Sequence, residues 1–331
     1  MNRIADRWRQ EVADRAKAMA PEETRRALLT ARLWSRRKTA RWRELPDVLI
    51  IGGQRCGTSS LYKWLGRHPN AAPSLRKEIG YFSVDHAKGE GWYRAHFPLT
   101  LRRRAASVTG RPLVTFEATP DYLFDPRAPE RARALVPEAK LIALLRDPTD
   151  RAVSHFHLNV RLRDEWLDLE DALRVEDERL GDEWARVAAD PNHRAIALRR
   201  FSYVARGSYA EQLERWLAVY SRRQLLVLRS EDLYAQPAET YRRILGFLDL
   251  PAWEPPEFRN YSFIGPFGGT YPDPPDTVRR FLADRLAEPN RRLVDLLGEE
   301  FRWDAPATGG QPLITPSPSI QLPGLSSSDA R

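Results

Sequence analysis

Two hydrophobic patterns alternate along the chain between residues 46 and 304. Short runs of apolar and β-branched residues predict buried strands at 47–51, 113–116, 140–145 and 225–228. Segments with apolar positions every three to four residues predict helices at 61–65, 128–135, 149–160, 165–180 and 209–220. Two further helices are expected at 276–287 and 290–298.

Strands that alternate with helices favour a mainly parallel sheet with helices on both faces. We therefore predict an α/β fold for residues 46–304, a three-layer, doubly wound and mainly parallel sheet. Residues 305–331 are dominated by Pro, Ser and Gly, which predicts a disordered tail. No apolar run approaches the roughly 18 residues that indicate a membrane span.

Residues 1–45 precede this pattern and are expected to form a basic helical arm. Its apolar residues recur at helical spacing on both sides of Pro21, at Ile4, Trp8, Val12, Ala16, Leu28, Leu29 and Leu33. The arm is expected to pack on the body or to form a homodimer through its helices. A membrane-surface helix is less favoured, because acidic residues are mixed into the polar face.

Charge and cysteine content narrow the function classes. The net charge is +8, and the arm carries most of it, so the body is nearly neutral. A nucleic-acid-binding domain usually keeps a basic face in its folded core, so we predict no nucleic-acid partner. Cys56 is the one cysteine, which excludes an intramolecular disulfide and a cysteine metal cluster. With no apolar segment near Met1 that would serve as a signal peptide, these features favour the cytoplasm.

The loop after the first predicted strand carries the clearest chemical signal. Gly52 and Gly57 lie between a strand and a helix, and the hydroxyl residues Thr58, Ser59 and Ser60 follow. Such a turn directs backbone N–H groups and the helix dipole at an anion, although glycine-rich turns also serve packing alone. A nucleotide-triphosphate loop has a lysine after its second glycine. Thr58 stands at that position, so the loop is suited to one 5′-phosphate.

A carboxylate follows the strand at 140–145 and has two interpretations. Asp147 is a candidate metal ligand, but Asp147-Pro148 also marks a turn that opens a helix, and this second interpretation is favoured. We predict no metal site.

Two segments resemble signature motifs of sulfotransferases that use 3′-phosphoadenosine 5′-phosphosulfate (PAPS). Residues 50–61, IIGGQRCGTSSL, resemble the 5′-phosphosulfate loop of this family, and residues 144–155, LLRDPTDRAVSH, resemble its 3′-phosphate segment. Weaker matches occur at 77–82, 117–122, 206–209 and 231–233. The resemblance covers residues 46 to 304 in the family's order, and the end of this stretch is similar to the heparan-sulfate and bacterial branch.

The resemblance implies a P-loop-like fold and metal-free transfer of a sulfuryl group from PAPS to an acceptor hydroxyl, with 3′-phosphoadenosine 5′-phosphate (PAP) as product. It implies that Arg55 stabilises the charge that develops on the bridging oxygen of the donor. Arg146 and Ser154 are expected at the 3′-phosphate, where a guanidinium binds an oxyanion through two hydrogen bonds. The other residues that it places at the nucleotide are Gln54, Cys56, Gly57, Thr58, Ser59, Ser60, Arg206, Tyr209, Gly268, Gly269 and Thr270.

The resemblance also implies a base and an acceptor site. Glu78 matches the general base of the heparan-sulfate branch, and Lys77 beside it steadies that charge or contacts the sulfate. The cytosolic branch uses a histidine as base, so four histidines are rivals: His68, His86, His96 and His155. The residues expected to contact the acceptor are Lys77, Tyr81, Phe82, Asp121 and Tyr122. The pocket is expected from 76–125, 160–205 and 261–271, with further rings at Trp92, Tyr93, Phe263 and Phe267.

Three departures from that branch limit the choice of acceptor. The branch has a lysine where Ala118 stands, a Lys-Gly-Arg loop where residues 267–272 read FGGTYP, and a disulfide that this chain cannot form. These differences argue against a heparan-type polysaccharide and leave a saccharide or a small natural product as acceptor. Two alternatives stay open, a P-loop kinase or other phosphotransferase and a non-catalytic nucleotide-binding module.

Overall fold

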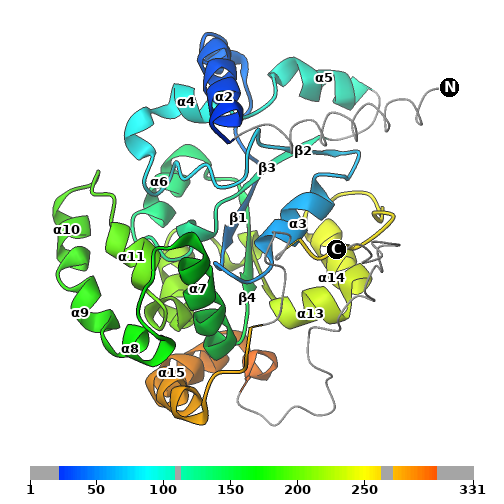
Figure 1. Cartoon of the computed structure of the whole chain (residues 1–331). Helices are drawn as coiled ribbons and strands as arrows, with labels where there is room; N and C mark the ends of the chain where they lie inside the picture. The colour runs from blue at the N-terminus through cyan, green and yellow to red at the C-terminus, as the bar shows by residue number, and fades with distance from the viewer. Residues whose placement is uncertain (1–21, 109–112, 262–270, 304–331) are drawn as a thin grey trace, which may run out of the picture.

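A five-stranded parallel sheet lies at the centre of the protein (Figure 1). Its strands, in the order β2-β3-β1-β4-β5, are β1 (Val48–Gly52), β2 (Ala71–Pro73), β3 (Val114–Ala118), β4 (Lys140–Leu145) and β5 (Leu225–Arg229). This computed structural model describes residues 22–108, 113–261 and 271–303. The helix expected at 4–16, the tail after residue 305 and the expected binding residues Phe263, Phe267, Gly268, Gly269 and Thr270 lie outside the described residues.

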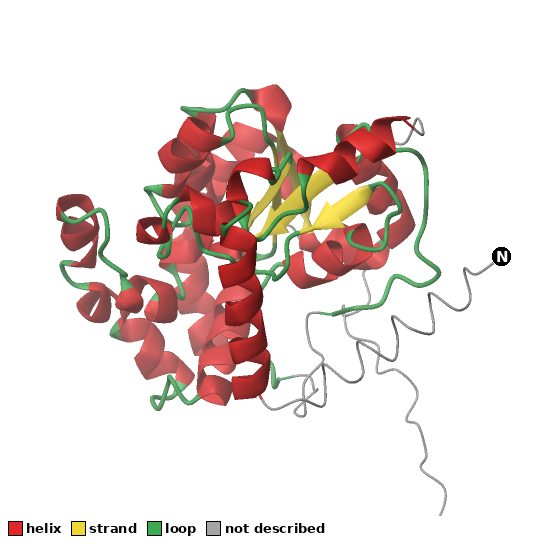
Figure 2. Cartoon of the chain, turned by 90° about the horizontal axis from the view of Figure 1, so that it is seen from above, coloured by secondary structure: helices red, strands yellow, loops and turns green. Residues whose placement is uncertain are grey.

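Helices surround the sheet in both views (Figures 1 and 2). Before β4 they are α2 (Glu22–Arg37), α3 (Thr58–Leu65), α4 (Glu90–Arg94), α5 (Thr100–Val108) and α6 (Ala128–Leu135). Between β4 and β5 they are α7 (Pro148–Leu162), α8 (Leu169–Arg174), α9 (Glu176–Leu180), α10 (Glu183–Ala189), α11 (Ile196–Phe201) and α12 (Tyr209–Leu217). After β5 follow α13 (Ser230–Ala235), α14 (Pro237–Phe247) and α15 (Asp276–Leu297). Short 3₁₀ turns include η1 (Ala40–Trp42), η2 (His86–Lys88), η3 (Pro120–Tyr122), η4 (Ala205–Gly207), η5 (Arg222–Gln224) and η6 (Glu299–Phe301).

The sheet separates two hydrophobic cores, which confirms the predicted three-layer α/β fold. Successive side chains of a strand point to opposite faces. Leu49 and Ile51 of β1 therefore join one core with residues of α6 and α12, whereas Val48 and Ile50 join the other with residues of α3 and α14. Each of these four side chains is buried, and burial of such a side chain stabilises the fold by about 1.5–3 kcal/mol.

Most of the predicted elements are present, and the differences have tertiary causes. The four predicted strands are confirmed. The edge strand β2 was not predicted, because it is three residues long, has no apolar run and forms by pairing with β3. The helix predicted at 165–180 is divided at Val175 into α8 and α9. After the break, the buried Glu176 carboxylate accepts hydrogen bonds from the N–H groups of Val204 and Ala205, at 2.7 and 2.9 Å.

The two helices predicted near the end of the domain form one continuous helix. Helix α15 continues through Pro289, although proline removes one helical hydrogen bond. Leu286 and Leu293 lie on either side of this position and are buried in two separate cores, so packing along the whole helix outweighs the local defect. None of the helices in the described ranges is long and apolar enough to cross a bilayer.

The topology brings three loops to one edge of the sheet. Because β1, β3 and β4 are parallel neighbours, their carboxyl ends meet at the same edge, where ligands bind in open α/β sheets. The loops that follow are 53–57, 119–127 and 146–147. All three carry residues of the motifs identified in the sequence.

Candidate active site

The loop between β1 and α3 has the form of an anion cradle. The Gly53 N–H donates to the Leu144 carbonyl at 2.6 Å, which ties the loop to the end of β4. Gly57 has φ of 92° and caps α3 without a side-chain hydrogen bond, a conformation that side chains with a Cβ rarely adopt. The first N–H groups of α3, at Thr58 and Ser59, have no carbonyl of a preceding turn to bind. The positive end of α3 therefore faces the mouth of this loop.

Two of the residues predicted to lie at the nucleotide, Ser60 and Cys56, are buried within the protein. The Ser60 Oγ accepts a hydrogen bond from the Tyr261 N–H at 2.9 Å and lies 3.2 Å from the Tyr234 hydroxyl, in a fully buried position. The prediction that this hydroxyl binds phosphate is therefore corrected, because it holds the segment at Tyr261 against α3. Burial raises the pKa of the Cys56 thiol to about 11, so this group stays protonated and serves packing. Gln54 and Ser59 are partly exposed and Thr58 is buried at the start of α3.

A hydrogen bond joins the two sequence motifs. The Arg55 Nε donates to the Ser154 Oγ at 3.0 Å, although these residues lie 99 positions apart. The Ser154 hydroxyl is also 2.8 Å from that of Tyr271, which begins the described range 271–303. Burial alone would raise the pKa of Tyr271, but the hydrogen bond with Ser154 and the charges of Arg55 and Arg146 lower it below its usual value. Positive charge is thus concentrated where the motifs meet.

Arg146 ends β4 at this same place. Its Nη2 lies 3.3 Å from the Asp150 Oδ2, a long and partly exposed ion pair one helical turn into α7. The Tyr209 hydroxyl donates to the Arg146 carbonyl at 3.0 Å and lies 3.8 Å from the Cys56 Sγ. Tyr209 is 1% exposed, so the prediction that it contacts the nucleotide is corrected. Its hydroxyl instead fixes the two motifs to each other.

Asp147 begins α7, as the favoured interpretation of the sequence holds. Its carboxylate accepts the Asp150 N–H at 2.9 Å as an N-cap, and burial raises its pKa to about 6. In the three described ranges, no group of three or more His, Cys, Asp or Glu is placed to bind a metal ion.

Glu78 lies on the loop beside the end of β3. Its N–H donates to the Ala118 carbonyl at 2.8 Å, and its backbone has φ of 61°. The carboxylate is 63% exposed and lies 2.5 Å from the Lys77 Nζ. Glu78 is therefore held by the sheet at its backbone and open to an incoming molecule at its side chain, while the Lys77 side chain is only partly exposed.

A buried network that the sequence motifs did not reveal holds this loop. The Glu117 carboxylate, fully buried at the end of β3, accepts hydrogen bonds from Thr119, Tyr93 and Tyr122 at 2.7, 2.7 and 3.0 Å. The Thr119 and Tyr122 hydroxyls in turn accept the N–H groups of Gly80 and Phe82, each at 3.3 Å. Burial raises the pKa of Glu117. A carboxylate within the apolar run of β3 was the one signal in the sequence for this network.

The predicted aromatic acceptor contacts are part of the core. Phe82, Tyr93 and Tyr122 have no exposed surface, and Tyr81 and Trp92 are at most 9% exposed. Their rings pack on one another, with the Tyr81 and Tyr93 centroids 4.4 Å apart and those of Phe82 and Tyr122 5.3 Å apart. The prediction that these rings stack on an acceptor is therefore corrected, because they support the Glu78 loop from below.

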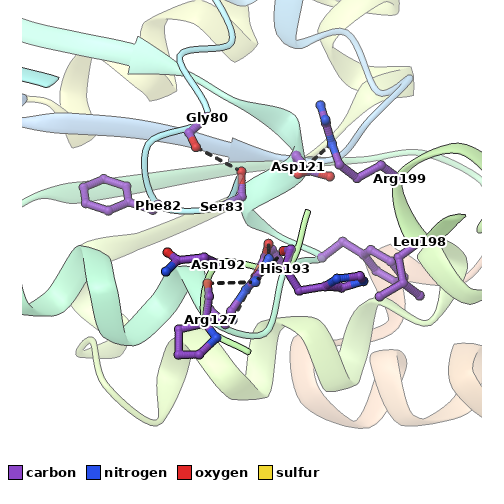
Figure 3. A network of polar contacts seen from close by, with 12 residues as sticks. Gly80, Phe82, Ser83, Asp121, Arg127, Asn192, His193, Leu198 and Arg199 are labelled. Carbon is purple, nitrogen blue, oxygen red and sulfur yellow. Dashed lines mark hydrogen bonds and ion pairs between the residues drawn. The ribbon is translucent and has the colours of Figure 1, made fainter. Parts of the chain in front are cut away.

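Asp121 connects the end of β3 to the helices between β4 and β5. Its carboxylate lies 2.7 Å from the Arg206 Nη2. It also lies 3.5 Å from the Arg199 Nε, and Figure 3 shows these two residues side by side. Burial would raise the pKa of Asp121, but Arg206 and Arg199 lower it, so the group is ionised and paired within the protein. Arg206 is itself buried by this pair, so both residues position α11.

A surface hollow of about 600 Å³ adjoins this network. It is lined by Glu183, Asp190, Asn192, His193, Arg194, Ala195, Ile196, Ala197 and Phe201. Arg127 connects it to the sheet by donating to the carbonyls of Pro191 and His193 at 3.0 and 2.8 Å (Figure 3). The hollow lies within the 160–205 segment expected to build an acceptor pocket.

The four histidines considered as alternatives to Glu78 as general base are mostly buried in packing contacts. His155 is fully buried against Tyr203, and burial lowers its pKa well below the usual value. His96 is 1% exposed with its pKa lowered to about 4 by burial, and the buried His68 lies 3.0 Å from the Pro251 carbonyl. Only His86 of the four keeps an intermediate exposure. Glu78 is therefore the most accessible base among these candidates.

Comparisons with known proteins all find similarity to sulfotransferases. A family model described as "Sulfotransferase domain" matches residues 45–261. Human bifunctional heparan sulfate N-deacetylase/N-sulfotransferase 1 is 32% identical over 224 residues, which cover 66% of this chain and 23% of that protein. Human heparan sulfate glucosamine 3-O-sulfotransferase 6 is 25% identical over 288 residues, covering 79% of this chain and 74% of that protein. The chain thus spans about a quarter of the first relative's length.

Among solved structures, a sulfotransferase from Alicyclobacillus acidocaldarius is similar with a TM-score of 0.57 and 27% identity. The similarity covers 77% of this chain and 96% of that chain.

Proposed function

Because the chain belongs to the sulfotransferase domain family, we propose that it transfers a sulfuryl group from PAPS to a hydroxyl of a saccharide or small natural product. The observation that carries the proposal is the hydrogen bond from Arg55 to Ser154. It joins the loop at 52–60 to the segment at 146–154, so one bisphosphate nucleotide can contact both motifs. Two anionic groups then meet Arg55, Arg146 and the first N–H groups of α3.

The residues present suit this donor. A Cβ added at Gly57 would lie 3.0 Å from Leu233 Cδ2 and from the Tyr234 hydroxyl, so the glycine lets the loop pack closely against α13. Behind the loop, the guanidinium of Arg151 is fully buried, and its Nη2 donates to the Tyr203 carbonyl. Its Nε and Nη1 have no hydrogen-bond partner among the described residues. Buried donors without a partner favour an acceptor group nearby. PAPS supplies the sulfuryl group when bound and leaves PAP as the product.

The mechanism assigns separate roles to Glu78 and Arg55. Glu78 accepts the proton of the acceptor hydroxyl as its oxygen attacks sulfur. Lys77, 2.5 Å from that carboxylate, orients it. Arg55 stands over the phosphate cradle and stabilises the negative charge of the departing phosphate, an effect worth about 2.7–4 kcal/mol for comparable groups. No step of this sequence calls for a metal ion.

The hollow beside Asp121 is proposed as the acceptor site. Its polar lining of Asn192, His193 and Arg194 next to Ile196 and Phe201 is suited to a sugar or a hydroxylated ring, which present both polar edges and apolar faces. We also propose that the protein works in the cytoplasm, which the absence of a disulfide partner for Cys56 supports. Self-association through residues 1–45 stays a prediction.

The decisive experiment incubates the full chain with ³⁵S-labelled PAPS and a panel of saccharides and phenolic or aliphatic alcohols. We expect label on an acceptor, together with release of PAP, and no loss of activity in EDTA. Turnover of ATP that depends on magnesium would favour the phosphotransferase alternative instead. Binding of PAP by calorimetry without transfer to any acceptor would favour the non-catalytic module.

A further inference from the structure

Large apolar side chains are exposed at one end of the molecule, away from the proposed active site. Trp34 in α2 is 65% exposed and Trp42 in η1 is 50% exposed. Leu28 of α2 and Leu101 and Val108 of α5 are each at least 64% exposed. Surfaces with several exposed bulky apolar groups mark interaction sites rather than ordinary solvent-facing surface.

The elements that carry these side chains are fixed to one another. The inner side of α2 is anchored by the buried Leu33 and by Arg36, whose Nε donates to the Ala95 carbonyl at 2.6 Å. The Thr100 hydroxyl at the start of α5 donates to the Trp42 carbonyl at 3.2 Å. Helices α2, α4 and α5 gather at the same end of the molecule (Figure 1). We name the outer sides of α2, η1 and α5 the Trp/Arg surface.

The Trp/Arg surface is strongly basic. Residues 22–43 contain eight Lys or Arg and two Glu. The exposed cations are Arg26, Arg32, Arg37, Lys38 and Arg41, with Arg102 and Arg104 on α5. Two of them lie over the exposed rings, since the Lys38 Nζ is 4.2 Å from the Trp34 ring and the Arg41 Cζ is 4.1 Å from the Trp42 ring. Cations and indoles are thus intermixed at the same depth.

The position of this surface leaves the catalytic edge accessible. The Arg103 Nη2 of α5 binds the Asp47 carboxylate at 2.6 Å, immediately before β1 begins. The Trp/Arg surface therefore lies at the amino ends of the strands, while Arg55 and Ser154 lie beyond their carboxyl ends. A large partner on one end does not cover the other.

We propose that the Trp/Arg surface binds the headgroup region of an anionic lipid bilayer. Tryptophan is favoured at the membrane–water interface, where its ring is half buried and its N–H is hydrated. Clustered arginines and lysines attract anionic headgroups, and their long side chains reach around the apolar groups to the phosphates. Nucleic acid would satisfy the cations and stack on the indoles, but it offers no apolar phase for Leu28, Leu101 and Val108. This inference goes beyond the proposed sulfuryl transfer and does not depend on it.

The test is sedimentation of the full chain with vesicles of phosphatidylcholine alone or mixed with phosphatidylglycerol. We expect binding to the mixed vesicles, weakened by salt, and little binding to phosphatidylcholine alone. The variant Trp34→Ala/Trp42→Ala and the variant Arg37→Glu/Lys38→Glu/Arg41→Glu should each bind the mixed vesicles at least about tenfold more weakly. Trp166→Ala is the matched control, because this tryptophan is 78% exposed on a different part of the molecule and should leave vesicle binding unchanged.

Three results would overturn the proposal. Equal binding of the wild-type chain and both variants would show that the surface is not involved, and so would the absence of any vesicle binding. Tight binding of duplex DNA that both variants lose, without vesicle binding, would assign the surface to nucleic acid. A concentration-dependent dimer that Trp34→Ala/Trp42→Ala dissociates would assign it to a second copy of the chain. Circular dichroism of each variant separates these results from misfolding.

Discussion

The hydrogen bond between Arg55 and Ser154 allows a quantitative prediction about the transition state. The Ser154 Oγ receives the Arg55 Nε at 3.0 Å and so orients the guanidinium toward the phosphate cradle. If turnover depends on this orientation of the Arg55 guanidinium, then Ser154 contributes to turnover mainly by orienting Arg55. The informative perturbations are therefore Arg55→Ala, Ser154→Ala and the double variant.

The expected magnitudes follow from the contacts. Removal of Arg55 eliminates the cation at the bridging oxygen and should lower kcat by about 10²–10³-fold. A hydrogen bond with a charged group contributes about 1.5–3 kcal/mol. Tyr271 lies 2.8 Å from Ser154 and also interacts with Arg55, so it retains part of the orientation in Ser154→Ala. For Ser154→Ala we therefore expect a loss at the lower end of this range, about 1.5 kcal/mol, which corresponds to a roughly tenfold lower kcat.

The assay is kcat at saturating labelled PAPS, which separates the chemical step from nucleotide affinity. The double variant should be about as slow as Arg55→Ala alone, because Ser154 has no guanidinium left to orient. Arg174→Ala is a suitable control, since this arginine is exposed on α8 and pairs with Glu170 at the surface. If the free-energy losses of the two single variants sum to the loss of the double variant within about 0.5 kcal/mol, the two residues act independently. That result would refute this account of Ser154.

Three further predictions test other parts of the structure. Glu78→Gln should lower kcat by roughly 10²–10⁴-fold while PAP binding by calorimetry is unchanged, because the exposed carboxylate contacts Lys77 and not the cradle; normal turnover would exclude Glu78 as base. Arg146→Ala should weaken PAP binding by about 2–4 kcal/mol in the same experiment, and unchanged affinity would remove Arg146 from the site. Burial raises the pKa of Glu176 from 4.5 to about 7, so the folded state holds its proton more tightly and loses stability as the pH rises through this interval. In urea denaturation, the unfolding free energy of Glu176→Gln should therefore fall by about 2.5 kcal/mol less than that of the wild type between pH 5 and 8; equal slopes would contradict the raised pKa.

The geometry of the turn between β1 and α3 was predictable because its signals are local. An apolar strand, a turn with Gly57 at positive φ and a helix start with hydroxyl residues are all recorded within a dozen positions. Backbone N–H groups at such a turn point the same way whatever surrounds them. The same holds for Asp147, whose N-cap role depends on the next three residues.

The roles of individual side chains were less predictable, because they depend on residues far away in the chain. Ser60 and Tyr209 stand within or near the motifs, but partners more than 60 positions distant occupy their hydroxyls. Tyr81 and Phe82 match an acceptor-binding stretch, yet contacts with Tyr93 and with residues after β3 bury their rings. A polar or aromatic residue in a motif can face a ligand or a neighbour, and sequence spacing does not distinguish these cases.

The amino-acid sequence by itself determined the alternation of strands and helices and the position of the glycine turn between β1 and α3, because hydrophobic periodicity and turn chemistry are encoded over short segments. The choice of Glu78 as candidate base came from the resemblance to the sulfotransferase family and stays a prediction. The tertiary structure decided that Arg55 meets Ser154, that the buried Glu117 holds the loop of Glu78, and that Trp34 and Trp42 share a basic outer surface. These outcomes follow from which faces pack together, and packing is a property of the whole chain.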